Sequence, residues 1–207
     1  MTRRRRPPPG LPRDRRGSTI VEFAIVVPVM ILVIMALGDM LYRQYAQSML
    51  AGAVQKAGRD SSLQGTDGST IDGKVVAMMA TMLVTPRQSC PSTTAATWCS
   101  TRYAYDTFTE VGPEPFTDGN TDGRCDNGEP YSDVNANGRW DANPGVGGQG
   151  GANAVALYTM TMTYQRLFPV ARMFGWPATV TISASTLLKN QPYAAQTVTE
   201  AVTGNCP

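Results

Sequence analysis

Residues 15–60 read RRGSTIVEFAIVVPVMILVIMALGDMLYRQYAQSMLAGAVQKAGRD. From Ile20 to Leu37 every residue is apolar except Glu22 and Pro28. A membrane helix tolerates a proline at such a position. A helix of that length measures about 27 Å at about 1.5 Å per residue, which is close to the thickness of the hydrocarbon layer of a bilayer. The sequence therefore predicts one membrane-spanning helix near the N-terminus.

The charges before this run predict its orientation. Seven arginines precede residue 17, namely Arg3, Arg4, Arg5, Arg6, Arg13, Arg15 and Arg16. Such an excess keeps the N-terminus in the cytoplasm. We therefore expect a single-pass protein of the inner membrane, in contact with membrane lipid, whose C-terminal domain is periplasmic or extracellular.

A secretory signal peptide cleaved near residues 36–38 is the alternative. Two features favour the anchor. The apolar run is longer than a usual signal-peptide core. The helical pattern also continues beyond it, with Leu41, Tyr45, Met49 and Ala53 on one stripe.

Composition excludes several classes of function. Without residues 1–17 the basic count falls from 18 to 11 and the acidic count from 16 to 15, which leaves a net charge of −4 and no basic surface for nucleic acid. The chain has no histidine, which excludes Ser-His and Cys-His dyads and histidine-bound zinc. No GxSxG motif appears, and we expect no enzymatic activity.

All four cysteines follow the apolar run: Cys90, Cys99, Cys125 and Cys206. An even number in an exported region predicts disulfides, and four cysteines allow three pairings. We favour Cys90–Cys99 as a local bridge together with Cys125–Cys206. No pair has CxxC spacing, so a zinc or redox site has little support.

Residues 15–23 resemble the processing site of type IV prepilins and their relatives, in which a basic leader ends in glycine and a glutamate stands at the fifth position after it. The longer stretch, residues 15–60, resembles the TadE-like proteins of tight-adherence (Flp-type) pilus systems. The shared features are an Arg-Arg-Gly sequence, Glu-Phe, an apolar span, an acid at its far end, and an aromatic and alanine-rich helix.

This resemblance implies that a prepilin-type peptidase cuts after Gly17, so that Ser18 becomes the N-terminus. It also implies partners among other pilus or secretion-system subunits. Glu22 could then pair with the new α-ammonium of a neighbouring subunit, which would offset the cost of burying a carboxylate. The alternative is that Glu22 reaches the cytoplasmic headgroups and has no partner.

The rest of the chain predicts an α+β fold: the N-terminal transmembrane helix extends into a long helix, followed by a small antiparallel-sheet domain with a calcium-loop insertion. We expect a basic cytoplasmic leader at 1–17, the TadE-like helix at 18–60, and an exported α+β domain at 61–207 whose acidic loop spans 118–141. The apolar spacing predicts a second helix, and alternation predicts strands. The expected elements are a helix over Ile71–Val84 and strands over Thr101–Val111, Asn153–Phe168 and Ala178–Leu188.

The sharpest chemical motif is DGNTDGRCDNGE, residues 118–129, which fits the calcium-loop pattern D-x-[DN]-x-[DN]-G-x5-E. Its oxygens are hard donors that suit Ca²⁺ and not zinc or copper. The expected ligands are the side chains of Asp118, Asn120, Asp122, Asp126 and Glu129, with the backbone carbonyl of Arg124.

A second half-copy follows 15 residues later, at Asp133, Asn135, Asn137, Gly138 and Asp141. Its twelfth position is Pro144, so the closing acid is missing. This copy is either a weaker site or shares a ligand with the first. The alternative for both is a solvated acidic surface loop.

The sequence thus favours a pseudopilin-like or minor-pilin component of a tight-adherence pilus or related secretion assembly. The calcium loop would stabilise its exported domain. The alternative is a membrane-anchored calcium-binding adhesin that has no role in assembly.

Overall fold

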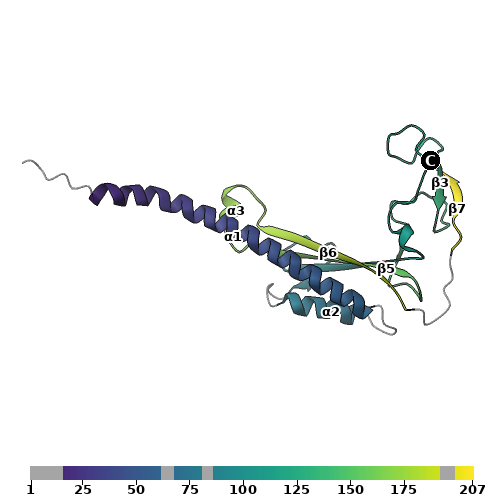
Figure 1. Ribbon diagram of the computed structural model, residues 1–207, viewed down its shortest axis with the longest axis horizontal. Coiled ribbons are helices and arrows are strands. Elements are labelled where there is room, and N and C mark those ends of the chain that lie inside the picture. Colours follow the sequence, from purple (N-terminus) through teal and green to yellow (C-terminus); the bar gives the residue numbers. More distant parts are fainter. Residues whose placement is uncertain (1–15, 62–67, 81–85, 192–198) are drawn as a thin grey trace, which may run out of the picture.

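The computed structural model describes residues 16–61, 68–80, 86–191 and 199–207. Residues 1–15 of the predicted leader and the last turn of the helix predicted to end at Val84 lie outside these ranges. The first element, α1, is a single helix over Arg16–Ser61. It confirms the prediction of an apolar helix that continues far beyond its apolar run. Figure 1 shows the first half of α1 projecting from the molecule and the second half lying on a sheet.

A mixed sheet forms the body of the domain. Its strands run in the order β1 (Arg87–Gln88), β2 (Thr97–Tyr105), β5 (Val155–Gln165) and β6 (Thr179–Lys189), with β4 (Val146–Gly147) pairing β2. The helix α2 (Gly68–Met79) precedes it, and a short helix, α3 (Val170–Met173), connects β5 to β6. A separate two-stranded sheet pairs β3 (Pro130–Asp133) with β7 (Val202–Asn205).

The two clearest strand predictions are confirmed, because β5 and β6 lie within one to three residues of their expected bounds. Three other expectations were wrong in part. The sheet is not purely antiparallel, since β1 runs parallel to β2; the chain between them doubles back within the loop that the Cys90–Cys99 disulfide closes. The strand predicted over Thr101–Val111 begins at Thr97, where β5 supplies partners, and ends before a 3-10 turn at Phe108–Glu110. The helix α2 begins at Gly68 and not at Ile71.

Both long helices pack against one face of the sheet. Alternate residues of a strand point to the same face, and Tyr158, Met160, Met162 and Tyr164 of β5 all point toward the helices. Helix α1 contributes Ala46, Leu50, Ala53, Val54 and Ala57, helix α2 contributes Ile71, Val75 and Met79, and β6 contributes Val180 and Ile182. Of the α2 methionines, Met79 is fully buried in this core and Met78 packs against it partly buried.

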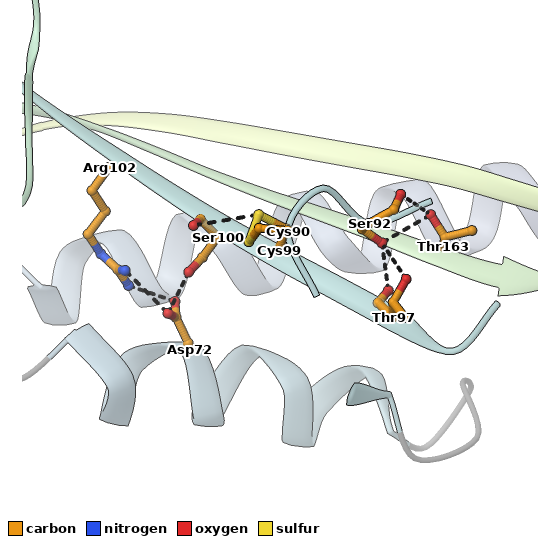
Figure 2. Close-up of a disulfide and its surroundings, with 8 residues drawn as sticks. All are labelled: Asp72, Cys90, Ser92, Thr97, Cys99, Ser100, Arg102 and Thr163. Carbon is orange, nitrogen blue, oxygen red and sulfur yellow. Dashed lines mark hydrogen bonds and ion pairs between the residues drawn. A yellow bond between two sulfur atoms is a disulfide. The ribbon is translucent and has the colours of Figure 1, made fainter. Parts of the chain in front are cut away.

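A buried polar cluster fixes α2 to the sheet. The Asp72 carboxylate, on α2, accepts hydrogen bonds from the Arg102 guanidinium (2.6 Å) and from the Ser100 hydroxyl (2.6 Å), both on β2 (Figure 2). The Tyr158 hydroxyl donates to the same carboxylate at 2.6 Å. Burial, together with this bond, raises the pKa of Tyr158 above its usual range. Because Asp72 is only 5% exposed, these partners offset the cost of burying its charge.

The disulfides Cys90–Cys99 and Cys125–Cys206 are both formed, which confirms the favoured pairing. The first ties the loop between β1 and β2 to the sheet. Within that loop the buried Ser92 hydroxyl donates to the Thr163 hydroxyl at 3.0 Å, and Figure 2 shows this contact beside the disulfide.

Candidate functional site

The projecting half of α1 is apolar and uncovered. It is the one helix, among the described residues, that is long and apolar enough to cross a membrane, and none of its most apolar window is buried within the chain. Ile20, Phe23 and Ile25 are each about 70% exposed. A surface of this kind requires lipid or protein around it, which supports α1 as a candidate membrane anchor.

The predicted processing residues lie in the first turns of this helix. Gly17 is the second residue of α1, and the backbone of Ser18 follows it in helical conformation. Glu22 stands exposed on the apolar surface and makes no ion pair with any described residue. The three residues therefore share one end of the helix, and the carboxylate is open to a partner from outside the chain.

The acid at the far end of the span has a partner that the sequence did not predict. Asp39 forms an ion pair with Arg166, the residue directly after β5. Both side chains are less than one-fifth exposed. The pair therefore fastens the sheet to α1 where the apolar run ends, and it neutralises the charge of Asp39.

Beyond this pair α1 keeps an apolar face turned outward. The stripe expected at Leu41, Tyr45, Met49 and Ala53 does not face the core; only Ala53 is buried. The sheet contacts the opposite side, at Ala46, Leu50 and Ala57. Leu41 and Tyr45 lie outside this contact and remain 70% and 56% exposed.

The first acidic loop is held by bonds between its side chains and its own backbone. The Asp118 carboxylate accepts from the Gly123 amide at 2.9 Å, and Asp122 accepts from the Arg124 amide at 2.8 Å. The Asn120 side-chain oxygen accepts from the Asp122 amide at 2.9 Å. Gly123 has a positive φ of 76°, which glycine adopts without strain. These bonds curl the oxygen-bearing side chains into one turn.

Glu129, the last residue of the motif, hydrogen-bonds to two backbone amides of this loop. One carboxylate oxygen accepts from the Gly119 amide at 2.7 Å, and the other accepts from the Asp126 amide at 3.4 Å. The predicted ligand residues from Asp118 to Glu129 therefore lie in one compact turn.

The second loop repeats this geometry. Asp133 accepts from the Gly138 amide at 2.7 Å, and Asn137 accepts from the Arg139 amide at 2.8 Å. Gly138 has a φ of 77°, which matches Gly123. The side-chain amides of Asn135 and Asn137 donate to the Asp141 carboxylate at 3.0 and 2.5 Å. The half-copy thus folds like the complete motif.

Glu114 supplies the acid that the second loop lacks. Its carboxylate accepts from the Val134 amide and from the Asp141 amide, both at 2.9 Å. Val134 and Asp141 hold the second and ninth loop positions, the same positions whose amides bind Glu129 in the first loop. Glu114 precedes both loops, so the linear motif missed it. The signal in the sequence was the repeat of Glu-Pro-aromatic, at residues 114–116 and 129–131.

The two loops are joined by a short antiparallel pairing. The Thr117 amide donates to the Pro130 carbonyl and the Ser132 amide donates to the Pro115 carbonyl, both at 2.9 Å. Phe116 pairs with Tyr131 between these bonds. The disulfide from Cys125 to Cys206 then ties the first loop to the end of β7. Figure 1 shows this assembly at the end of the molecule remote from the projecting part of α1.

The loop pair offers oxygen atoms and no other metal-binding side chain. No group of three or more His, Cys, Asp or Glu side chains is arranged around a metal position in the described part of the chain. The available donors are carboxylates, asparagine oxygens and backbone carbonyls, which is the mixture that calcium binds. A carboxylate that accepts one amide bond retains further lone pairs for a cation.

Residues 17–59 match the model of a protein family described as TadE-like protein. The match confirms the resemblance drawn from residues 15–60, and it coincides with α1. No curated protein and no solved structure matches this chain.

Proposed function

We propose, from the TadE-like segment at residues 17–59, that this chain is a pseudopilin-like or minor-pilin component of a tight-adherence pilus or related secretion assembly. Helix α1 anchors it in the inner membrane with the N-terminus in the cytoplasm, and the sheet domain lies outside. The family match suggests a component associated with this type of pilus and partners among its other subunits. The pseudopilin role, the orientation and the compartment are part of the proposal.

The exposed apolar face of α1 carries this proposal. An anchor alone needs an apolar surface only between Ile20 and Leu37. The face continues in line with it to Leu41 and Tyr45, which lie beyond the apolar run on a helix whose other side is already packed. An open apolar stripe at this place fits the packing of a helix from another subunit.

Photo-crosslinking tests this contact. We expect a photoreactive amino acid at Leu41 to form a crosslink to another pilus subunit in the membranes of the native host. The matched control places the same amino acid at Gln55, which is also exposed on α1 but lies where the surface is polar. Equal crosslinking at both positions, or none at Leu41, would contradict a role for this stripe in assembly.

Processing after Gly17 follows from the same proposal. A cut there leaves Ser18 at the start of the helix and Glu22 one turn along, without a charged partner in the described chain. N-terminal sequencing and intact mass of the membrane-extracted protein are expected to give Ser18. A start at Met1 or Thr2 would contradict peptidase processing, and a start near Gly38 would identify a cleaved signal.

The role of Glu22 has its own test. We expect Glu22→Gln to insert normally into the membrane but to fail to join the assembly, because the carboxylate no longer pairs with an α-ammonium. Normal assembly of this variant would support a carboxylate that only reaches the headgroups.

The loop pair supports a second part of the proposal, which is calcium binding. Glu114, Glu129 and Asp133 are each less than 10% exposed. No lysine or arginine forms an ion pair with them in the described residues. Buried carboxylates whose partners are neutral amides keep an uncompensated charge, and a bound cation offsets it. We propose that Ca²⁺ binds each loop, with Glu129 closing the first and Glu114 the second.

A calcium-binding adhesin remains the second candidate. The position of the loops favours it, since they lie far from the projecting part of α1, at the end of the domain where an external surface could reach them (Figure 1). Calcium-dependent attachment to cells by a chain with an uncut N-terminus would support the adhesin over the pilus component.

A further inference from the structure

The connection between β5 and β6, residues 166–178, carries a concentrated apolar surface. Leu167, Met173, Phe174 and Trp176 are each more than half exposed. Elsewhere outside α1, the exposed large apolar side chains of the described chain are scattered singly, at Phe108, Val146, Leu187 and Val202. Single exposed apolar residues are ordinary, whereas four on one short connection mark a contact surface.

This connection lies beside α1 at the end of its apolar run. The Phe168 ring seats against Gly38, where a Cβ would meet it at 3.1 Å. Trp176 lines one groove together with Val33 and Leu37. Val33 lies about 6 Å along the helix before Leu37, at about 1.5 Å per residue. A bilayer that encloses the span from Ile20 to Leu37 therefore reaches the level of Trp176.

The charges at this level fit a membrane surface. The Asp39 carboxylate is already paired with Arg166, so it does not repel anionic headgroups. The other charged side chains of the connection and of the adjacent helix turn are Arg172 and Arg43, and both are exposed. Arginine above an apolar and tryptophan-bearing surface is the arrangement that favours the boundary between headgroups and acyl chains.

We propose that the β5–β6 connection is a second membrane contact, which inserts Phe174 and Trp176 into the interface of the leaflet next to the sheet domain. The inference rests on the proposed function in one respect, namely that α1 spans the bilayer. A domain held at two places, by α1 and by this connection, keeps a fixed tilt against the membrane. The exposed stripe of α1 then points in one direction parallel to the membrane.

Tryptophan quenching in lipid vesicles tests this contact. The full chain is reconstituted in vesicles of phosphatidylcholine and phosphatidylglycerol, with and without phosphatidylcholine brominated near the headgroup. We expect brominated lipid to quench the wild-type emission and Trp176→Phe to lose this quenching. Trp140→Phe is the matched control and is expected to keep it, because Trp140 lies in the remote second loop.

Carbonate extraction of the same vesicles reports separately on α1. One outcome is that the protein stays in the vesicles while Trp176 is quenched by aqueous iodide and not by brominated lipid. That result would overturn the interfacial contact and leave the anchor intact. Protection of Trp176 from both quenchers would overturn it in favour of a covering protein. Release by carbonate would overturn the anchor and the contact together.

Discussion

Glu114 and Glu129 hold equivalent places in two different loops: each binds the amides of the second and ninth residues of its loop, but only Glu129 belongs to the loop that it closes. Glu114 reaches the second loop across the pairing of Phe116 with Tyr131. The two copies therefore repeat every 15 residues along the chain, but their glutamates are exchanged: Glu114, which precedes the first loop, closes the second, and Glu129, which precedes the second, closes the first.

Calcium stoichiometry tests this exchange. We expect the wild-type protein to bind two calcium ions by titration calorimetry, and Glu114→Gln to weaken one of them at least about tenfold, or about 1.4 kcal/mol. Glu129→Gln should weaken the other. Glu110→Gln is the matched control, since this nearby carboxylate accepts from the amides of Asp106 and Thr107 and has no hydrogen bond to a described residue of either loop. Unchanged affinity in Glu114→Gln would make this residue purely structural.

Proteolysis measures the opening of each loop separately. Arg124 and Arg139 are exposed at the same position of each loop, so trypsin reports on the opening of each one. We expect calcium to slow cleavage after both arginines and a chelator to restore it. Glu129→Gln should accelerate cleavage after Arg124 alone, and Glu114→Gln should accelerate cleavage after Arg139 alone. Equal protection by magnesium would contradict a calcium-selective site.

Calcium should also stabilise the domain as a whole. A site that binds only the folded state contributes about 1–3 kcal/mol at concentrations of roughly ten to one hundred times its Kd. We expect the melting temperature in detergent to rise on addition of calcium and to return on chelation. A double variant, Glu114→Gln with Glu129→Gln, should show no such rise.

Alkaline unfolding should depend on Tyr158 and Tyr164. Burial raises the pKa of both hydroxyls, that of Tyr164 to about 12. A raised folded-state pKa of a tyrosine gives stability that is complete below the unfolded pKa of about 10 and is lost as the pH rises toward the folded value. We expect the free energy of unfolding to fall above pH 10, by up to about 1.4 kcal/mol per pH unit for each tyrosine. Either Tyr→Phe variant should reduce this slope.

The two variants should differ at neutral pH. Tyr158→Phe removes the hydrogen bond to the Asp72 carboxylate and should cost about 1.5–3 kcal/mol. The Tyr164 hydroxyl is buried without a hydrogen-bond partner among the described residues, so Tyr164→Phe should be neutral or stabilising. Urea unfolding at pH 7 distinguishes them, and equal losses would contradict the importance of the Asp72 bond.

The two disulfides should contribute unequally. Cys125 and Cys206 are separated by 81 residues, whereas Cys90 and Cys99 are separated by 9. The entropy of the unfolded chain makes the longer bridge worth about 2 kcal/mol more. We expect the serine pair at 125 and 206 to lower the free energy of unfolding more than the serine pair at 90 and 99. The reverse order would mean that the Cys90–Cys99 disulfide stabilises the folded sheet directly, and not mainly by restricting the unfolded chain.

The sequence predicted the features of the fold that depend on short-range patterns of residues. The apolar run defined the exposed part of α1, and alternation located β5 and β6, because one buried face imposes a period of two. The favoured disulfide pairing, chosen among three because Cys90 and Cys99 are close in sequence, is the one formed. The features that the sequence did not predict depend on contacts between residues that are far apart in the chain. The Asp39–Arg166 pair, the start of β2 at Thr97 and the place of Glu114 all arise only when separate strands come together.

The length of β5 has a consequence for the ions that reach the acidic loops. This strand and Arg166, the residue directly after it, extend from Val155, on the side of the loops, to the end of the apolar run of α1, which is about 36 Å at about 3.3 Å per residue. Cations gather near an anionic bilayer only within a Debye length of about 8 Å at physiological salt. In the proposed arrangement, with α1 across the bilayer, the loops stand several times farther from it. They therefore sample the ion concentration of the surrounding fluid and not that of the membrane's counterion layer.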